Sequence, residues 1–315
     1  MDGSFHSNLR LPDFIIGGAP KCGTTSVHFV LGQSPDVGIP DDEVHFFDAD
    51  DPIAHPDFVR HGGGCYDVDA PPSQDWYAAR FAPYRNKLLI GEDSTLYLQS
   101  EVAPARIART LPNVKLIFML RDPVRRAYSQ YWHMVTRGRA TCDFETAIRR
   151  HPPIMLGSTY LPGLRRYRDH FDAGQVRVCL FEDYLADPRA FVADLCTFLG
   201  LAPIRLEPGA GWHNRTTYPA HPRMQRLLNR VSRQVARLQY VDHFNEASGL
   251  RRRLGRRAHG LYFRHVHPRL LTRSRPPEMA PETQAFLTRH LSDRNAGLSR
   301  MLGRDLSAVW PGFRS

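Results

Sequence analysis

One segment near the start of the chain combines a lysine, glycines and hydroxyl side chains, a set of groups that can bind a phosphate. It reads Gly-Ala-Pro-Lys-Cys-Gly-Thr-Thr-Ser over residues 18–26 and follows a short apolar run. At a turn from a strand into a helix, successive backbone N–H groups and the helix N-terminus converge on an anion. The residues expected to bind the phosphate are Lys21, Cys22, Gly23, Thr24, Thr25 and Ser26.

The position of the lysine separates this segment from a Walker A loop, in which the lysine follows the second glycine. Here Thr24 follows Gly23, and Lys21 precedes that glycine by two positions. A glycine-containing turn is about as often a structural connection as a ligand site. However, only three of the 42 Lys and Arg residues are lysines: Lys21, Lys87 and Lys115. A lysine kept where arginine is the usual cation favours the functional interpretation.

A second set of polar residues follows the apolar run at 115–120. Arg121 stands at the expected end of a strand, and Ser129 comes two helical turns later. The carboxyl ends of parallel strands face the ligand crevice, so both side chains are placed to bind another phosphate. Asp122 and Pro123 also fit a structural role, as the N-cap and first residue of the next helix. Asp122 alternatively matches a Walker B carboxylate that holds Mg²⁺, although the adjacent arginine disfavours a metal.

An acidic and aromatic segment, 41–48, offers a candidate general base. It reads Asp-Asp-Glu-Val-His-Phe-Phe-Asp, with Glu43 and His45 beside two phenylalanines. A carboxylate at the rim of a partly desolvated pocket is expected to have a raised pKa, as suits a general base. A glutamate in an acidic loop is more often simply exposed. The functional interpretation therefore depends on the two phosphate-binding segments.

Alternating strands and helices must position these residues, and the apolar pattern predicts them. Strands are expected at 13–18, 87–90, 115–120 and 175–181. Helices are expected at 26–31, 74–81, 102–111, 124–136, 144–150, 161–171 and 189–199. The alternation predicts an α/β fold, a P-loop-type three-layer sandwich with a central, mainly parallel sheet flanked by helices.

The last third of the chain has a different composition, and strand signals stop after Leu201. Residues 201–222 are rich in Pro, Gly, Asn and Thr and are expected to form a long loop. Most of the net charge of +10 lies further on, because residues 222–275 hold fourteen arginines. A helix from 223 to 238 is expected to pack through an apolar stripe, with its arginines in solvent. The stripe is Met224, Leu227, Leu228, Val231, Val235 and Leu238, and the arginines are Arg223, Arg226, Arg230, Arg233 and Arg237. One further helix is expected at 281–301.

Composition excludes several classes of protein. With 315 residues and 42% hydrophobic residues, the chain can form a sizeable core. Its five cysteines are scattered without a Cys-x-x-Cys pair, which disfavours a disulfide framework or a zinc ribbon. The first residues lack a basic segment followed by an apolar run, and no apolar run is long enough to span a bilayer. A cytoplasmic location is expected.

Together, three of these segments resemble the sulfotransferases that use 3′-phosphoadenosine 5′-phosphosulfate (PAPS). Residues 20–26 are similar to the 5′-phosphosulfate loop of that family, and Arg121 with Ser129 is similar to its 3′-phosphate motif. Residues 43–48 are similar to the catalytic segment of the heparan sulfate N- and 3-O-sulfotransferases. The three motifs occur in the order of the family.

The resemblance implies how PAPS would bind. Lys21 would contact the sulfuryl oxygens and the oxygen that bridges phosphorus and sulfur, and residues 23–26 would hold the 5′-phosphate. Arg121 and Ser129 would bind the 3′-phosphate, which remains on the product 3′-phosphoadenosine 5′-phosphate (PAP). No metal is implied.

The resemblance also implies the catalytic groups. Glu43 would take the proton of the acceptor as its oxygen attacks sulfur in line, and His45 would assist. Family members often have a lysine where this chain has Asp93, so no acceptor contact is transferred to that position.

The remaining expectations concern the covering loop and the domain layout. Residues 201–222 would cover the cofactor, with Arg215 and Tyr218 in contact with it; Trp212 is expected either to stack on adenine or to pack in a core. The resemblance implies one sulfotransferase domain over 1–315, with a P-loop-like core at 12–200 and a helical, Arg-rich part at 223–315.

Two alternatives to sulfuryl transfer stay open at this point. The first is a P-loop kinase that uses ATP, which the absence of a lysine after Gly23 disfavours. The second is a nucleic-acid or anionic-membrane binding protein that acts through its arginines. In the leading hypothesis the acceptor is a carbohydrate or another small molecule with a hydroxyl, an anionic acceptor included. Nucleic acid is not an expected partner, and Arg223 to Arg237 offers a peripheral membrane contact.

Overall fold

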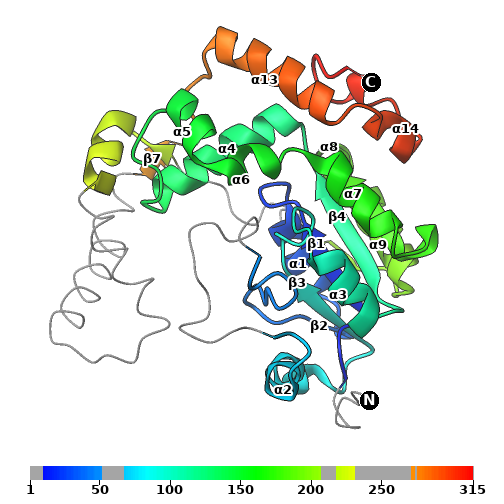
Figure 1. The fold of residues 1–315 in the computed structure, drawn as a ribbon. Helices are drawn as coiled ribbons and strands as arrows, with labels where there is room; N and C mark the ends of the chain where they lie inside the picture. Colours follow the sequence, from blue (N-terminus) through cyan, green and yellow to red (C-terminus); the bar gives the residue numbers. More distant parts are fainter. Residues whose placement is uncertain (1–9, 52–66, 207–217, 231–270, 274, 315) are drawn as a thin grey trace, which may run out of the picture.

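A five-stranded parallel sheet stands at the centre of the structure, a computed structural model that describes residues 10–51, 67–206, 218–230, 271–273 and 275–314 (Figure 1). The strands lie in the order β2-β3-β1-β4-β5. They are β1 (Phe14–Gly18), β2 (Val37–Gly38), β3 (Leu89–Asp93), β4 (Lys115–Leu120) and β5 (Val176–Leu180). The chain passes from β1 to the β2 and β3 side and then crosses to β4. Parallel sheets bind ligands at such a switch point, beyond the carboxyl ends of the strands.

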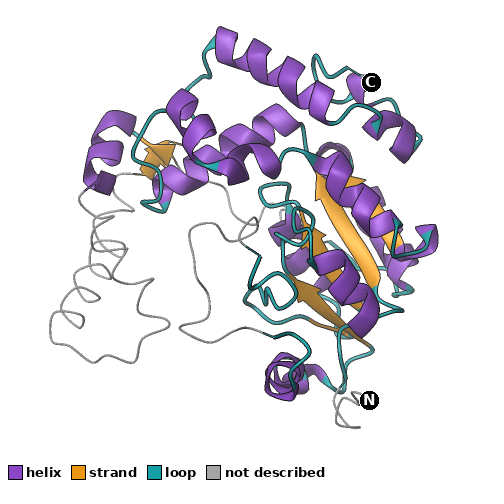
Figure 2. Cartoon of the chain, in the orientation of Figure 1, coloured by secondary structure: helices purple, strands orange, loops and turns teal. Residues whose placement is uncertain are grey.

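Helices flank this sheet (Figure 2), and residues 116–120 of β4 are all 0% exposed, so β4 is covered on both faces. The predicted α/β sandwich with a parallel central sheet is confirmed. Among the described residues, no helix combines the length and the apolar composition needed to cross a bilayer. The helices are α1 (Thr24–Leu31), α2 (Pro71–Ala79), α3 (Ala103–Thr110), α4 (Pro123–Thr136), α5 (Phe144–Arg150), α6 (Pro152–Leu156), α7 (Tyr160–Arg168), α8 (Phe181–Ala186), α9 (Pro188–Leu199), α13 (Pro281–Arg294) and α14 (Leu298–Leu302).

Strand β3 lies further along the chain than the apolar pattern predicts. The expected strand was 87–90, whereas β3 runs to Asp93 and includes Glu92, which is 0% exposed. The Glu92 carboxylate accepts hydrogen bonds from the hydroxyls of Tyr77 and Tyr97, both at 2.5 Å. A buried carboxylate with such partners is compatible with a strand interior. A search for apolar runs therefore ends the strand too early.

A small antiparallel pair follows the sheet, so the expectation of no strands after Leu201 is wrong. β6 (Tyr218–Pro219) pairs with β7 (Leu271–Arg273). Strands of two and three residues are too short to leave a periodic pattern in the sequence.

The described part of the helix expected at 223–238, residues 223–230, packs through polar side chains rather than through Met224 and Leu227 of its apolar stripe. Residues 222–230 are helical, and the rest of the expected helix lies outside the described residues. Met224 and Leu227 are 53% and 54% exposed, whereas Gln225 and Asn229 are each 1% exposed. Asn229 Nδ2 donates to the carbonyls of Val135 and Ala140, both at 2.8 Å. The last carbonyls of a helix lack intrahelical donors, and those at the end of α4 determine which face of this segment is buried.

The helix expected at 281–301 is two helices, α13 and α14, with a break between them. Gly297 has a φ of 93°, which ends regular helix geometry. Asn295 is 0% exposed, and its side-chain oxygen accepts from the backbone N–H of Tyr160 at 2.7 Å. Helix α13 lies along α4 and α5 in Figure 1, and Leu287 and Leu291 pack into the apolar cluster formed there.

Candidate active site

The loop between β1 and α1 has the backbone geometry of an anion-binding turn. Lys21 has a φ of 70° and Gly23 a φ of 91°, both in the left-handed region. Residue 23 must be glycine, because a Cβ there would lie 2.5 Å from the ring of Phe181. Left-handed residues in a turn direct successive N–H groups toward one point. Helix α1 begins at Thr24, and the N–H groups of Thr24 and Thr25 precede the first intrahelical hydrogen bonds, which the N–H groups of Ser26 and Val27 donate to the Gly23 carbonyl.

The predicted loop residues do not all face the same way. The Cys22 thiol is 0% exposed and lies 3.7 Å from the Tyr160 hydroxyl, and burial raises its pKa to about 11. Its backbone N–H donates to Ala19 at 3.3 Å. The Cys22 thiol is therefore neutral and packs in the protein interior against Tyr160, so it does not share the exposed side of the loop with Lys21. Thr24 and Ser26 are 4% and 7% exposed and lie in the first turn of α1.

The Lys21 side chain reaches helix α4, where His133 contacts it. Lys21 Nζ lies 3.3 Å from His133 Nδ1. Burial, together with the charges of the nearby Arg126 and Arg137, lowers the pKa of Lys21 to about 8. Burial, together with Lys21, holds the pKa of His133 well below its ordinary value. The imidazole is therefore neutral and accepts a hydrogen bond from the ammonium group.

His133 was not among the predicted site residues, although helical spacing points to it. It follows Ser129 by four residues, and residues four apart lie on the same face of a helix. Both residues are in α4, and Ser129 is partly exposed.

Arg121 extends from the end of β4 to the Lys21 loop. Arg121 Nη1 donates to the backbone carbonyl of Lys21 at 3.4 Å, and the guanidinium lies 5.1 Å from the centre of the Phe181 ring. The two cations predicted to bind opposite ends of one cofactor therefore lie at the same edge of the sheet.

Asp122 is the N-cap of α4. Its carboxylate accepts from the N–H groups of Val124 and Arg125, at 2.9 and 3.1 Å. This is the structural role that the sequence allowed for it. In the described part of the chain, no cluster of three or more His, Cys, Asp and Glu residues could hold a metal ion.

Glu43 and His45 form a hydrogen-bonded chain with Asp48. His45 Nε2 lies 2.6 Å from Glu43 Oε2, and His45 Nδ1 lies 3.3 Å from Asp48 Oδ2. Burial alone would lower the pKa of His45, but the carboxylates of Asp48 and Glu43 outweigh burial and raise that pKa to about 10. His45 is therefore an imidazolium ion that pairs with both carboxylates.

The predicted rise in the pKa of Glu43 is wrong. Partial burial would raise this pKa, but hydrogen bonds from His45 and from Thr95 Oγ1, at 3.0 Å, outweigh burial and lower it. The Glu43 side chain is 43% exposed, so it is ionised and open to an incoming group. An aromatic neighbourhood raises a carboxylate pKa only when no cation is paired with it.

Residues at the end of β3 hold the segment that carries Glu43. The Ser94 hydroxyl accepts from the N–H of His45 at 2.9 Å. The Tyr97 hydroxyl accepts from the N–H groups of Phe46 and Phe47, at 2.9 and 3.2 Å. These contacts fix the backbone of residues 45–47 to the sheet edge.

Asp93, where related enzymes often have lysine, pairs with a histidine. Asp93 Oδ2 lies 3.3 Å from His28 Nδ1 of helix α1. Burial raises the pKa of Asp93, and the charge of Glu43 adds to the rise. A carboxyl group therefore stands near Glu43.

The predicted covering loop is described only in part. Trp212 and Arg215 lie outside the described residues. The ring of Tyr218, in β6, lies 6.0 Å from that of Trp132. Tyr218 thus packs on the aromatic face of α4, which lies opposite the face that carries Arg126 and His133. Its contact with the cofactor stays a prediction.

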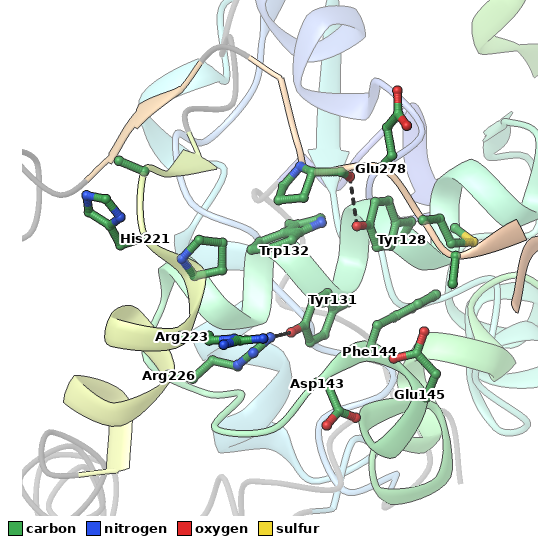
Figure 3. Close-up of a pocket in the computed structure, with 15 residues that line it drawn as sticks. Tyr128, Tyr131, Trp132, Asp143, Phe144, Glu145, His221, Arg223, Arg226 and Glu278 are labelled. Carbon is green, nitrogen blue, oxygen red and sulfur yellow. Dashed lines mark hydrogen bonds between the residues drawn. The ribbon is translucent and has the colours of Figure 1, made fainter.

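A separate cavity of about 560 Å³ lies on that opposite side of α4 (Figure 3). Tyr128, Tyr131 and Trp132 of α4 line it together with Phe144 of α5. Arg226 Nη1 donates to the Tyr131 hydroxyl at 3.1 Å, and carboxylates also stand at the rim. This cavity is aromatic and carries charges of both signs.

Comparisons with known proteins agree with this geometry. A sequence profile of the sulfotransferase family matches residues 12–204. The chain is 30% identical over 216 residues to bifunctional heparan sulfate N-deacetylase/N-sulfotransferase 2 of Bos taurus, a match that covers 62% of this chain and 22% of that protein. It is 28% identical over 204 residues to heparan sulfate glucosamine 3-O-sulfotransferase 3B1 of Mus musculus, covering 62% and 47% of the two chains. The matches therefore span less than half the length of these curated relatives.

A solved structure extends the likeness to the whole fold. The crystal structure of a sulfotransferase from Alicyclobacillus acidocaldarius aligns with a TM-score of 0.61 and 27% sequence identity. The alignment covers 95% of this chain and 99% of that one. The likeness includes the parallel sheet and the helices that position the candidate site.

Proposed function

Because the chain belongs to the sulfotransferase family, we propose that it transfers a sulfuryl group from PAPS to a hydroxyl of a carbohydrate or another small-molecule acceptor. The proposal rests on one observation above the others. Arg121 and Lys21 start from segments a hundred residues apart, yet the Arg121 guanidinium lies 3.4 Å from the Lys21 carbonyl. Two cations at one sheet edge match a ligand that carries phosphate at both its 3′ and its 5′ position.

The residues present fit the anionic cofactor. The start of α1 offers the N–H groups of Thr24 and Thr25, which have no carbonyl four residues back within the helix, and the left-handed Lys21 and Gly23 make the preceding loop concave. We assign the 5′-phosphosulfate to this loop and the 3′-phosphate to Arg121 and Ser129. PAPS would supply the sulfuryl group, and PAP would be the product.

We assign proton transfer to Glu43. Glu43 accepts the proton of the acceptor hydroxyl while the oxygen of that hydroxyl forms its bond to sulfur. The bond between sulfur and the 5′-phosphate oxygen breaks in line, and its electron pair stays on that oxygen. Lys21 and the loop N–H groups stabilise the charge there, so positioning and fixed dipoles supply most of the catalysis. His45 holds the Glu43 carboxylate in place, and Asp48 orients the imidazolium.

His133 supports the same step from α4. Its neutral ring accepts a hydrogen bond from Lys21 Nζ at 3.3 Å and thereby orients the ammonium group. A protonated imidazole at this position would repel Lys21, and burial disfavours that state. We therefore assign His133 as the residue that positions Lys21.

The acceptor class follows from the relatives only as a proposal. Two of the relatives described above are heparan sulfate sulfotransferases, and heparan sulfate is a carbohydrate.

A transfer assay tests the proposed function. The protein is incubated with PAPS that carries radioactive sulfur and with a panel of neutral and anionic carbohydrates and smaller alcohols, with the Glu43→Gln variant as control. We expect labelled acceptor and PAP to form in equal amounts with the wild type only. Phosphorylation of acceptors with ATP and Mg²⁺, and no transfer from PAPS, would support a kinase instead.

A further inference from the structure

A fully buried arginine lies directly beneath the Lys21 loop. Arg126, in the first half of α4, is 0% exposed. Its Nε donates to the carbonyl of Pro20 at 2.9 Å. Pro20 is the residue before Lys21, so the guanidinium contacts the backbone of the loop itself.

The other side of the guanidinium contacts helix α6. Arg126 Nη1 donates to the carbonyls of Pro153 and Ile154, at 2.9 and 3.1 Å. Gly157 makes room for the group, because a Cβ there would lie 2.3 Å from Arg126 Nη2. The planar, forked guanidinium of Arg126 therefore connects the loop to α6 by hydrogen bonds on two sides. A lysine ammonium group cannot form them with the same geometry.

The charge of Arg126 has no counterion among the described residues. Its recorded side-chain partners are all backbone carbonyls, and Nη2 has no hydrogen-bond partner in the described part of the chain. Burial of an ion without an opposite charge is costly. A second cation, Lys21, stands nearby, and Arg126 lowers the pKa of Lys21. The free protein thus concentrates positive charge around a loop built to receive an anion.

We propose that Arg126 is a positioning residue for sulfuryl transfer, one that holds the Pro20 carbonyl and places an uncompensated buried charge under the 5′-phosphosulfate. This inference rests on the proposed function. Binding of the anionic cofactor supplies the missing counterion, so part of the cofactor affinity comes from a group that the cofactor does not touch. Removal of the charge weakens cofactor binding, and removal of the fork geometry misplaces Lys21.

The neighbouring arginine gives a matched control. Arg125 is on the same turn of α4, but its side chain is 64% exposed and lies 3.9 Å from the Asp122 carboxylate. Arg125→Met removes the same formal charge from the surface, where solvent screens it.

The experiment is a calorimetric titration of the full chain with PAP, with turnover and thermal unfolding measured for the same samples. Arg126→Met, a neutral side chain of similar length, is expected to lower PAP affinity by roughly 10-fold or more, because charges inside a protein attract one another over several ångströms more strongly than in water. The rise in unfolding temperature caused by PAP is expected to shrink as well. Arg125→Met is expected to bind PAP as the wild type does.

Arg126→Lys separates the two parts of the inference. It keeps the charge and loses the fork, so kcat is expected to fall more than PAP affinity does. If Arg126→Lys and Arg126→Met instead lose affinity and turnover only in proportion to their unfolded fraction, the residue is purely structural and the inference is overturned. Wild-type PAP affinity in a folded Arg126→Met protein also overturns it. If the wild type itself does not bind PAP, the proposed function fails, and this inference fails with it.

Discussion

The two faces of helix α4 make different environments from one stretch of chain. The inner face turns Arg126 and His133 toward the Lys21 loop, where cations gather around an anion-binding turn. The outer face turns Tyr131 and Trp132 into an aromatic cavity whose rim carries charges of both signs (Figure 3). Residues three and four apart share a helix face, so both sets fit in about three turns. The difference indicates that selectivity for a doubly phosphorylated ligand belongs to the inner face alone.

Substitution of Glu43, the assigned proton acceptor, is expected to have the largest effect on turnover. Glu43→Gln keeps the size of the side chain but removes the carboxylate, so turnover should fall roughly 10²- to 10⁴-fold, the range of general base catalysis. PAP affinity should stay close to that of the wild type, since Glu43 is assigned to the acceptor. Steady-state kinetics and a PAP titration check both points. Substantial residual activity would contradict the assignment of Glu43 as the base.

Substitution of Lys21, the cation of the loop, is expected to have the second largest effect on turnover. Lys21→Ala should lower kcat by about 10²- to 10³-fold, the cost of losing a preorganised electrostatic contact in the transition state. Rapid-quench measurement of the first turnover isolates the chemical step. Near-normal turnover in a folded variant would contradict the role given to Lys21.

Substitution of Arg121 tests which phosphate of the cofactor this residue binds. Arg121→Ala should lower affinity for PAP by roughly 10- to 150-fold, which corresponds to about 1.5–3 kcal/mol for a hydrogen bond to a charged group. Affinity for adenosine 5′-phosphate, which lacks the 3′-phosphate, should change little. Equal losses for the two ligands would show that Arg121 does not read the 3′-phosphate.

The pH dependence of PAP binding tests the charge of Lys21. Its pKa is lowered to about 8 in the free protein, so it binds an anion well below that pH and deprotonates above it. Of the neighbouring histidines, His133 stays neutral because burial and Lys21 hold its pKa well below the ordinary value, and His45, with a pKa of about 10, loses its proton at higher pH than Lys21 does. Affinity should be flat below about pH 7, decline as the pH passes about 8, and then fall by at most about tenfold per pH unit. In Lys21→Arg the fall should disappear, and a flat wild-type profile would mean that Lys21 is not a ligand.

The outer face is expected to give the smallest effect on chemistry. Tyr131→Phe removes a hydroxyl that donates to the carbonyl of Cys142 at 3.0 Å and accepts from Arg226. Stability should fall by about 1–2 kcal/mol, because a buried acceptor loses its donor. Turnover should stay within about twofold, since the change is distant from the inner face. A tenfold loss of turnover in the folded variant would remove the distinction between the faces.

Much of the fold and of the inner face was predictable from sequence. Buried strands such as 115–120 carry continuous apolar runs, and helix α4 begins with an N-cap aspartate followed by proline, a pattern that local chemistry determines. Lys21 and Arg121 follow two such strands, so parallel topology brings them together.

The failures share a physical cause, which is pairing between polar side chains and their partners in the folded chain. The pKa of Glu43 falls because His45 carries a charge, and that charge depends on Asp48. Asn229 is buried because its side chain donates to the carbonyls of Val135 and Ala140, and hydropathy does not report such hydrogen bonds. Arg126 looks in the sequence like one solvated arginine among many, yet the fold buries it completely.

The central claim is that Lys21 and Arg121 bind opposite ends of the same doubly phosphorylated adenosine. Calorimetric titration of the wild-type protein with PAP, and separately with ATP and Mg²⁺, tests this most directly. The account predicts one PAP per chain, bound at least about tenfold more tightly than ATP with Mg²⁺, because only PAP places a phosphate at Arg121. Tighter binding of ATP with Mg²⁺, or no binding of PAP, would contradict it.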